Sequence, residues 1–306
     1  MADTKQEPDK LIGLDVGGTM IKGLLLSPQG EILAEETTPT NDDGTSGWRD
    51  RAKGVVTKLS QVHAACRIGV ASPGLASPDN HCITSLPNRL PGIEQLNWQQ
   101  WLGAPYPVPV FNDAQAALLA EVWRGTARSA RSVILLTLGT GVGGAAMVDG
   151  HVLRGWLGRA GHLGHISLNP DGPLDIVGTP GSLEDAIGEH NVVKRTNGRF
   201  KSTRDLVRAF EQGSPEAADA WLASVHALAA ALTGFINILD PEVIVIGGGI
   251  ADAGPSLFDP LNKCLDRFEW RPGGARVRIV KAELGKHAGA IGAAHGALLR
   301  ARAEDH

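Results

Sequence analysis

The sequence predicts an α/β protein made of two similar domains with a cleft between them, and two observations support this prediction. One is a repeated design, in which an apolar run breaks at a turn of Gly and Thr and then resumes, at residues 11–22 and again at 133–147. The other is the alternation of strand-like and helix-like segments after each repeat, which is typical of α/β domains. Two such halves favour a ligand site in the cleft between them.

The first half is predicted to begin with a hairpin over residues 11–26, because apolar residues flank the Gly17-Gly18 turn. A helix is predicted to begin at Asp113 and end at Gly125, with apolar residues at helical spacing. Between them we expect a strand, a helix, a strand ending in a sharp turn, a loop-rich stretch and a short strand, over residues 31–38, 48–65, 67–74, 75–103 and 107–112.

The second half is predicted to repeat this pattern with a glycine-broken hairpin over residues 133–152. Serine caps predict helices after Ser182 and after Ser214, the second running to about Leu239. A fully apolar strand at 242–247 is typical of a sheet covered on both faces. The other expected elements are an irregular stretch, a last strand and a closing helix, over residues 158–181, 276–284 and 288–303.

Composition favours a soluble enzyme with a small-molecule partner. The 306 residues are 42% hydrophobic, enough for two domains with their own cores. A net charge of -4, without long runs of Lys or Arg, argues against nucleic acid and anionic membranes as partners. Three scattered cysteines provide neither a disulfide framework nor a CxxC pair. With a polar N-terminus and no membrane-spanning apolar run, we expect a cytoplasmic protein.

The two glycine turns are candidate phosphate-binding loops. Consecutive N–H groups in glycine-rich turns can converge on an anion, and threonine adds a hydroxyl donor. Gly139, Gly141 and Gly144 match a dinucleotide fingerprint, but residues 145–150 continue as a strand where the fingerprint needs a helix. No Gly-Lys-Ser/Thr is present, which excludes a Walker A loop. The alternative is that both loops are tight turns that bind no ligand. Because two such loops occur at equivalent points of the two halves, we favour the binding of a nucleoside triphosphate.

Two carboxylates lie at strand ends beside these loops. Asp15 follows the first strand and could hold a magnesium ion or its waters, or could simply be a turn residue. Lys22 could offset phosphate charge, or could be an exposed strand lysine. Asp113 could accept a proton from a substrate hydroxyl, or could be the N-cap of its helix.

The stretch from Gly158 to His165 carries two histidines three residues apart, His162 and His165. A closed zinc site is not favoured, because no cysteine lies nearby. Ser182 and Asp185 are spaced as a capping box, and Glu184 could simply favour the positive end of that helix.

Taken together, these motifs resemble the ROK family of sugar kinases and repressors, within the actin-like, hexokinase-like ATPase superfamily. The resemblance spans nearly the whole chain, and its motifs are Asp15-Val-Gly-Gly-Thr19 with Lys22, Ser72-Pro-Gly74, Leu86-Pro-Asn88, Asn112-Asp113-Ala114, Leu138-Gly-Thr-Gly-Val-Gly-Gly144, Ala160-Gly-His-Leu-Gly-His165, Gly181-Ser-Leu-Glu184, Val245-Ile-Gly-Gly-Gly249 and Gly289-Ala-Ile-Gly-Ala-Ala294. It implies two actin-like ATPase (ribonuclease H-like) domains, a small one over residues 10–116 plus 294–306 and a large one over 117–293.

The resemblance also implies an ATP-dependent sugar kinase, a homodimer that uses Mg²⁺. Asp113 matches the family's catalytic base, which deprotonates the 6-hydroxyl of the sugar. The positions implied to bind the nucleotide are Asp15, Gly17, Gly18, Thr19, Lys22, Gly139, Thr140, Gly141, Gly143, Gly247, Gly248 and Gly249. Those implied to bind the sugar are Asn88, Asn112, Asp113, His162, His165 and Glu184.

Two departures from the family pattern are visible. His162 stands where the family has a glutamate, and an imidazole offers one donor and one acceptor where a carboxylate only accepts, so glucose specificity is not implied. The family's zinc cysteines correspond to Asp175, Val177 and Ser182, and only His165 is retained. We therefore predict no structural zinc, with the loop held by Pro173, Pro180 and the Ser182 cap.

The sequence leaves two other function classes to compare with a kinase. A ROK repressor carries an N-terminal winged helix-turn-helix, for which the ten residues before the first predicted strand are too few. The other is a catalytically silent sugar-binding protein, suggested by His162. The presence of both glycine loops and Asp113 favours the kinase.

Overall fold

The computed structural model describes residues 10–62 and 66–304. Expectations for residues 1–9, for the end of the first helix at 63–65 and for residues 305–306 lie outside this range. The chain divides into two compact units, residues 1–129, 154–160 and 284–306 in unit 1 and residues 130–153 and 161–283 in unit 2. The domain limits expected from the sequence, 10–116 plus 294–306 and 117–293, stay a prediction, because this division into compact units does not test them.

Unit 1 contains a five-stranded sheet in the order β3-β2-β1-β4-β7. β1 pairs antiparallel with β2 and parallel with β4, which in turn is parallel to β7. The elements of this unit are β1 (Lys10–Val16), β2 (Met20–Leu26), β3 (Ile32–Pro39), α1 (Trp48–Val62), β4 (Cys66–Ser72), β5 (Leu75–Ala76), β6 (Ile83–Ser85), α2 (Trp98–Leu102), β7 (Val110–Asn112), α3 (Asp113–Arg124), η5 (Gly285–His287) and α9 (Ala288–Glu304).

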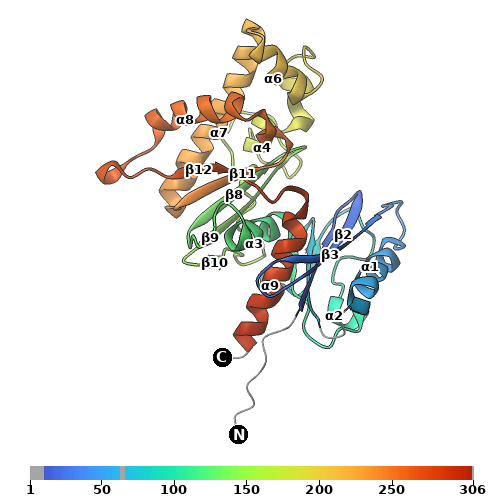
Figure 1. The fold of residues 1–306 in the computed structure, drawn as a ribbon. Coiled ribbons are helices and arrows are strands. Elements are labelled where there is room, and N and C mark those ends of the chain that lie inside the picture. Colours follow the sequence, from blue (N-terminus) through green and yellow to red (C-terminus); the bar gives the residue numbers. More distant parts are fainter. Residues whose placement is uncertain (1–9, 63–65, 305–306) are drawn as a thin grey trace. The chain divides into compact units, whose positions relative to one another are not determined.

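Apolar side chains that point alternately to the two sides of the strands bury both faces of the unit 1 sheet. Ile12 and Leu14 belong to the core cluster under α1, whereas Leu11 belongs to the cluster with α3 and α9. Figure 1 shows α1 and α9 on opposite sides of the sheet. α9 packs directly on the backbone of the strands, because a Cβ at Gly13 or Gly69 would collide with its carbonyl groups. The small residues of the last sequence motif therefore serve a close helix–sheet contact.

Unit 2 repeats this topology in the order β10-β9-β8-β11-β12. β8 pairs antiparallel with β9 and parallel with β11, as β1 does with β2 and β4. The predicted duplication of an α/β design is confirmed. The elements of this unit are β8 (Val133–Leu138), β9 (Val142–Val148), β10 (His151–Val152), η1 (Leu163–His165), α4 (Leu183–Ile187), η2 (Glu189–Asn191), α5 (Val192–Arg195), α6 (Thr203–Glu211), α7 (Pro215–Leu239), β11 (Val243–Gly247), η3 (Gly249–Ala253), α8 (Pro255–Phe268), η4 (Pro272–Gly274) and β12 (Arg278–Lys281).

The core of unit 2 is organised around α7. Ser214 caps the helix, with Pro215 in its first turn, as predicted. Trp221, Leu228 and Leu232 are fully buried in the cluster that contains the strands and α8. Among the described residues, α7 alone is long and apolar enough to cross a membrane by length and composition. In the most apolar stretch of α7, 44% of the residues are buried inside unit 2. The helix is therefore apolar because one side of it packs in the core.

Several elements were absent from the sequence prediction. The stretch expected to be loop-rich carries β5, β6 and α2, and the second half contains α5, α6 and α8 in addition to the predicted helices. The last predicted strand, over 276–284, is shorter in the structure and spans Arg278–Lys281. These differences lie outside the strands that carry the glycine loops.

Candidate functional site

The first glycine loop joins β1 to β2 and is held from behind by Thr40. Gly17 N–H donates to the carbonyl oxygen of Met20 at 3.0 Å, which closes the turn. The hydroxyl of Thr40 donates to the carbonyl oxygen of Gly17 at 2.6 Å, and its N–H donates to the carbonyl oxygen of Thr19 at 2.9 Å. Thr40 is fully buried, whereas Thr19 is exposed. Thr40 therefore fixes the carbonyl side of the loop and leaves the Thr19 side chain to solvent.

A cation lies over this loop. The guanidinium group of Arg89 lies directly against Gly18, so a Cβ atom at Gly18 would displace it. Asp42 contacts Arg89 and the residue after it. Arg89 Nε lies 3.7 Å from Asp42 Oδ2, and Leu90 N–H donates to Asp42 Oδ1 at 3.0 Å. Sequence analysis had not singled out Arg89. A positive charge above a glycine-rich turn suits an anionic ligand.

Asp15 and Lys22 face each other across the β1–β2 hairpin, where they are paired in register. Burial raises the pKa of Asp15 to about 6, against the opposing effect of Lys22 and with a further rise from the charge of Asp113. Gly289, in the first turn of α9, is so close that a Cβ there would lie 2.7 Å from the Asp15 carboxyl carbon. Lys22 Nζ donates to the carbonyl oxygen of Lys286 at 3.2 Å. The two predicted loop neighbours are therefore brought together.

Asp113 is the first residue of α3, directly after β7, and its side chain is exposed. Because β1, β4 and β7 are parallel, their carboxyl ends share one edge of the sheet, which places Asp113 on the same edge as Asp15. The alternative that Asp113 is the N-cap is wrong. Asn112 is the N-cap, accepting from Ala114 N–H at 2.9 Å in a capping box with Gln115.

The two asparagines expected at the sugar differ in environment. Asn112 is buried, and its side-chain amide also donates to the carbonyl oxygen of Gly74 at 2.9 Å, so both of its polar atoms have protein partners. Asn88 is exposed, with a left-handed backbone at φ 62°. Asn112 is thus a structural link at the start of α3, and Asn88 is accessible.

The second glycine loop, between β8 and β9, is held by the segment after α4. Gly139 N–H donates to the carbonyl oxygen of Gly141 at 2.9 Å. The N–H groups of Glu189 and His190 donate to the carbonyl oxygens of Gly139 and Thr140, at 2.9 and 3.0 Å. This loop continues into β9 as a strand, which confirms that it is not a dinucleotide fingerprint.

Glu184 ties α4 to the same loop. Its Oε2 accepts from the N–H of Val142 at 2.8 Å, and a Cβ at Gly141 would collide with it. Ser182 caps α4 through a 3.2 Å hydrogen bond from Asp185 N–H, as predicted. Glu184 therefore has a structural bond to the loop in addition to any ligand contact.

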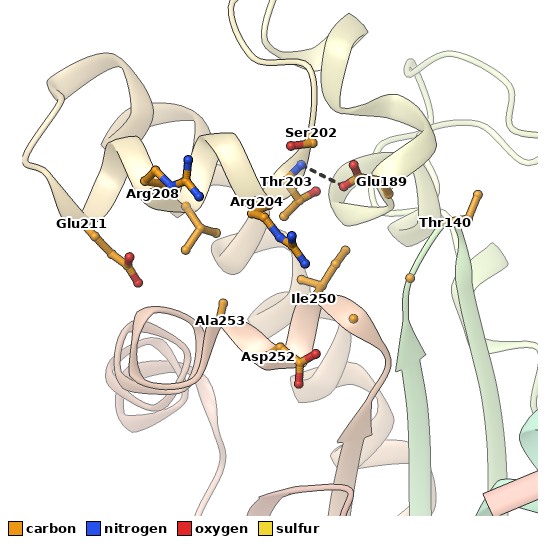
Figure 2. A pocket seen from close by; sticks show the side chains of 13 residues that line it. Thr140, Glu189, Ser202, Thr203, Arg204, Arg208, Glu211, Ile250, Asp252 and Ala253 are labelled. Carbon is orange, nitrogen blue, oxygen red and sulfur yellow. Dashed lines mark hydrogen bonds between the residues drawn. The ribbon is translucent and has the colours of Figure 1, made fainter. Parts of the chain in front are cut away.

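A pocket of about 700 Å³ opens beside the second glycine loop (Figure 2). Gly139 and Thr140 line it together with Gly249, so the loop and the glycine turn after β11 meet in one pocket. Figure 2 shows Arg204 extending from α6 toward Ile250. The remaining lining residues are Glu189, Ser202, Thr203, Val207, Arg208, Glu211, Asp252 and Ala253.

One buried side-chain atom in the described lining of this pocket has no hydrogen-bond partner. Thr203 is 4% exposed, and its hydroxyl makes no hydrogen bond, while its N–H donates to Glu189 Oε2 at 2.8 Å. A buried hydroxyl without a partner is costly, and a ligand in the pocket could satisfy it. The sequence offered no sign of Thr203, because α6 was not predicted.

His162 precedes the short η1 turn and His165 is its last residue, and His165 N–H donates to the carbonyl oxygen of His162 at 3.3 Å. Gly164 between them packs against the carbonyl group of Val142, where a Cβ would collide. The Nδ1 atom of His165 lies 2.9 Å from Oδ2 of Asp175. The two histidines are therefore fixed on β9, the strand that follows the second glycine loop.

Within the described ranges, no group of three or more His, Cys, Asp or Glu residues is arranged to hold a metal ion. Magnesium bound with phosphates needs only one or two protein carboxylates, so the Asp15 carboxylate is a sufficient protein ligand for it. The ordinary pKa of such a group is restored when a cation neutralises its charge. The residues present therefore fit Mg²⁺.

Comparison with known proteins finds relatives of one family that cover nearly the whole chain. A family model described as ROK family matches residues 11–300. The glucokinase of Thermotoga maritima is 34% identical over 307 residues, which cover 93% of this chain and 96% of that protein. The N-acetylmannosamine kinase of Escherichia coli O157:H7 is 28% identical and covers 92% of this chain and 96% of its own length.

Solved structures agree with these sequence relatives. A ROK hexokinase from Thermus thermophilus has a TM-score of 0.85 and 30% identity, with 96% of this chain and 99% of that chain covered. A ROK family glucokinase from Streptomyces griseus, in complex with glucose and AMPPNP, has a TM-score of 0.73 and 27% identity over 93% and 98% of the two chains. The structure therefore has the two-domain actin-like ATPase fold. The chain belongs to the ROK family, and its relatives place it among the sugar kinases of that family.

Proposed function

We propose that this protein is an ATP-dependent sugar kinase that transfers the γ-phosphate to O6 of a hexose or hexose derivative, with Asp113 as general base. The observation that carries the proposal is the pairing of Asp113 and Asp15 at one edge of the unit 1 sheet. They are close enough for the charge of Asp113 to raise the pKa of Asp15. Phosphoryl transfer needs a base for the hydroxyl and charge neutralisation for the phosphates, and these two carboxylates divide the tasks.

Asp113 is suited to receive a proton from a hydroxyl. Its side chain is exposed, and its Oδ1 accepts from Ala114 N–H at 2.8 Å. A carboxylate has about four lone-pair positions, so this bond orients the group and leaves acceptor capacity for a substrate hydroxyl.

For the nucleotide, we propose that the pocket beside the second glycine loop holds the nucleoside. Support comes from Gly139, Thr140 and Gly249 in its lining and from the unpartnered hydroxyl of Thr203. Within the two glycine loops, the N–H groups of Gly18, Thr19, Thr140 and Gly141 would bind phosphate oxygens, and Lys22 and Arg89 would offset their charge. Mg²⁺ beside Asp15 would neutralise charge on the transferred group when bound with the nucleotide.

For the sugar, we propose contacts from Asn88, His162, His165 and Glu184, with Asn112 acting through the N-cap of α3. Glu184 supports this by its bond to Val142 N–H, which would couple sugar binding to the position of the second glycine loop. A homodimer stays a prediction that rests on the resemblance, and light scattering of the purified protein would test it. A cytoplasmic location stays a prediction that rests on composition.

An ADP-release assay across hexoses, amino sugars and N-acetyl sugars tests the proposal. We expect turnover on at least one sugar and a loss of roughly 10²–10⁴-fold in kcat for Asp113→Asn, with nucleotide affinity retained. Asp219→Asn, an exposed position on α7, is the matched control and should keep full activity. Undiminished turnover of Asp113→Asn would remove Asp113 as the base. Sugar binding without any turnover would favour the silent sugar-binding protein.

A further inference from the structure

A buried carboxylate stands beside His165 in the loop that follows η1. The Asp175 side chain is 0% exposed, and its Oδ2 lies 2.9 Å from Nδ1 of His165, whose side chain is 24% exposed. The ring therefore has one nitrogen against a buried partner and part of its surface open to solvent.

The other carboxylate oxygen of Asp175 organises the loop itself. Asp175 Oδ1 accepts from the N–H groups of Val177 and Thr179, at 3.0 and 2.8 Å. The N–H of Asp175 donates to the carbonyl oxygen of Thr179 at 2.9 Å, and Leu174 bridges to Pro180. Both oxygens of Asp175 are therefore committed, one to the turn and one to His165.

These residues do not fit the zinc ion that the family resemblance implies at this loop. The corresponding donors would be Asp175, Val177 and Ser182 together with His165, and valine has no ligand atom. The Ser182 hydroxyl accepts from Asp185 N–H as the cap of α4. The histidine nitrogen that would need a free lone pair is already hydrogen-bonded to Asp175. The loop is thus built around a carboxylate instead of a metal.

We propose that Asp175 is a positioning residue that fixes the tautomer of His165, so that Nε2 presents a hydrogen-bond acceptor to a hydroxyl of the sugar. This inference rests on the proposed function for the sugar contact, although its tautomer part does not. An ionised carboxylate only accepts hydrogen bonds, so Nδ1 must carry the proton. In a neutral ring the remaining nitrogen then has a lone pair.

The charge state of Asp175 agrees with this geometry. Burial alone would raise its pKa, but the hydrogen bonds from His165 and from the Thr179 and Val177 N–H groups outweigh burial and lower it below the usual value. A metal on Nδ1 would impose the reverse tautomer, in which Nε2 donates. In this chain the sugar hydroxyl would therefore donate its proton to His165, whereas a zinc-bound histidine would donate its own proton to the hydroxyl.

The substitution Asp175→Asn tests the effect of Asp175 on the His165 tautomer separately from its hydrogen bonds within the turn. The amide oxygen can keep the two backbone bonds from Val177 and Thr179, and the NH₂ group then faces His165. An NH₂ group donates, so Nδ1 must become the acceptor and the proton moves to Nε2. Asp171→Asn, an exposed position in the same loop, is the matched control.

The test uses the full chain with ¹⁵N-labelled histidine at pH 8 and His165→Gln for assignment. In the wild type and in Asp171→Asn we expect the signature of a protonated Nδ1, and in Asp175→Asn that of a protonated Nε2. With the sugar that the wild type phosphorylates best, we expect the sugar KM of Asp175→Asn to rise by about tenfold or more, with the ATP KM within about twofold.

A protonated Nε2 in the wild type overturns the inference, as does a reversed tautomer with an unchanged sugar KM. Failure of the proposed function has a different signature, because then the wild type turns over no sugar. In that case the ¹⁵N spectra still decide the tautomer, and a shift of the His165 Nε2 signal on titration with sugars decides whether it meets a hydroxyl.

Discussion

The ring of His190 connects the second glycine loop to α4. Its Nδ1 lies 2.8 Å from the carbonyl oxygen of Thr140, and its Nε2 lies 3.0 Å from Oδ1 of Asp185. Both partners are acceptors, so a ring that satisfies both must carry two protons. Burial disfavours that charge, but the bonds to Thr140 and Asp185 and the charge of Glu184 outweigh it and raise the pKa of His190 above its usual value.

This bridge predicts a pH dependence of nucleotide binding. A raised pKa means that the bridge is complete at low pH and is lost as the pH rises through the pKa of His190 in the folded protein. The carbonyl of Thr140 then loses a donor, and we expect the ATP KM to rise severalfold between pH 6 and pH 9. His190→Ala should show the high KM already at pH 6. His151→Ala, at an exposed histidine in β10, should follow the wild type; parallel curves for all three proteins would contradict the prediction.

The ionised carboxylate of Asp15 should lower the free energy of unfolding at neutral pH. Its pKa is 3.8 in a model peptide and about 6 in the folded protein, so the folded state binds the proton more tightly. The free energy of unfolding therefore falls as the pH rises through this interval. We expect Asp15→Asn to gain about 2 to 3 kcal/mol at pH 8 and nearly nothing at pH 4, while losing kinase activity. Urea unfolding at both pH values measures this, and an equal gain at both would show that the charge is not the cause.

Gly289→Ala tests the close contact between α9 and Asp15. Because the added methyl group would lie 2.7 Å from the Asp15 carboxyl carbon, we expect the carboxylate to be displaced and kcat/KM for Mg²⁺-ATP to fall by about tenfold or more. Gly234→Ala in α7 is the matched control, since open space surrounds that position. It should raise stability by about 0.5 to 1 kcal/mol and leave activity unchanged. Equal activity of the two variants would contradict the prediction.

Arg89→Ala should weaken the binding of ATP. The guanidinium group lies against Gly18, and we expect its loss to raise the ATP KM by about threefold to tenfold, with a larger effect at low salt. Arg276→Ala is a suitable control, because Arg276 is also paired with an aspartate and has a similar exposed fraction, 47% against 46%. A KM for ATP that does not depend on Arg89 would show that its place over Gly18 is incidental.

Metal removal should leave the loop at residues 166–181 intact. Its turn is held by Asp175 and not by a metal, so EDTA should not change the melting temperature, and elemental analysis should find no stoichiometric zinc. Asp175→Ala should lower the melting temperature by several degrees, because it leaves the Val177 and Thr179 N–H groups without their acceptor. Stoichiometric zinc in the purified protein would overturn the account of this loop.

The parts of the fold that the sequence predicted are those governed by local chemistry. Both glycine hairpins, the Ser182 and Ser214 caps and the apolar strand at β11 follow from turn residues and periodicity, and the structure confirms them. α8 was missed because Pro260 lies inside it and Gly254 precedes it without a side-chain cap. α2 was missed because it has only five residues.

The parts of the site that the sequence did not predict depend on contacts between distant segments. Thr40 reaches the first glycine loop from the residue after β3, and Arg89 reaches it from a loop over forty residues further along the chain. His190 and Thr203 act on the second loop and its pocket from helical segments that carry no motif. Asp113 illustrates the opposite case, since the motif identified the residue and only the structure showed that Asn112 takes the capping role.

The packing of α9 against Gly13 has a consequence for synthesis of the protein. The sheet of unit 1 begins with the first strand of the chain, yet one of its faces is covered by a helix at residues 288–304. A ribosome releases β1 and β2 long before it releases α9, so unit 1 cannot complete its core until α9 has emerged. Unit 2 lies wholly between these segments and can fold first. The nascent chain is therefore expected to expose the apolar face of β1 until α9 emerges, a period in which chaperone binding would protect it.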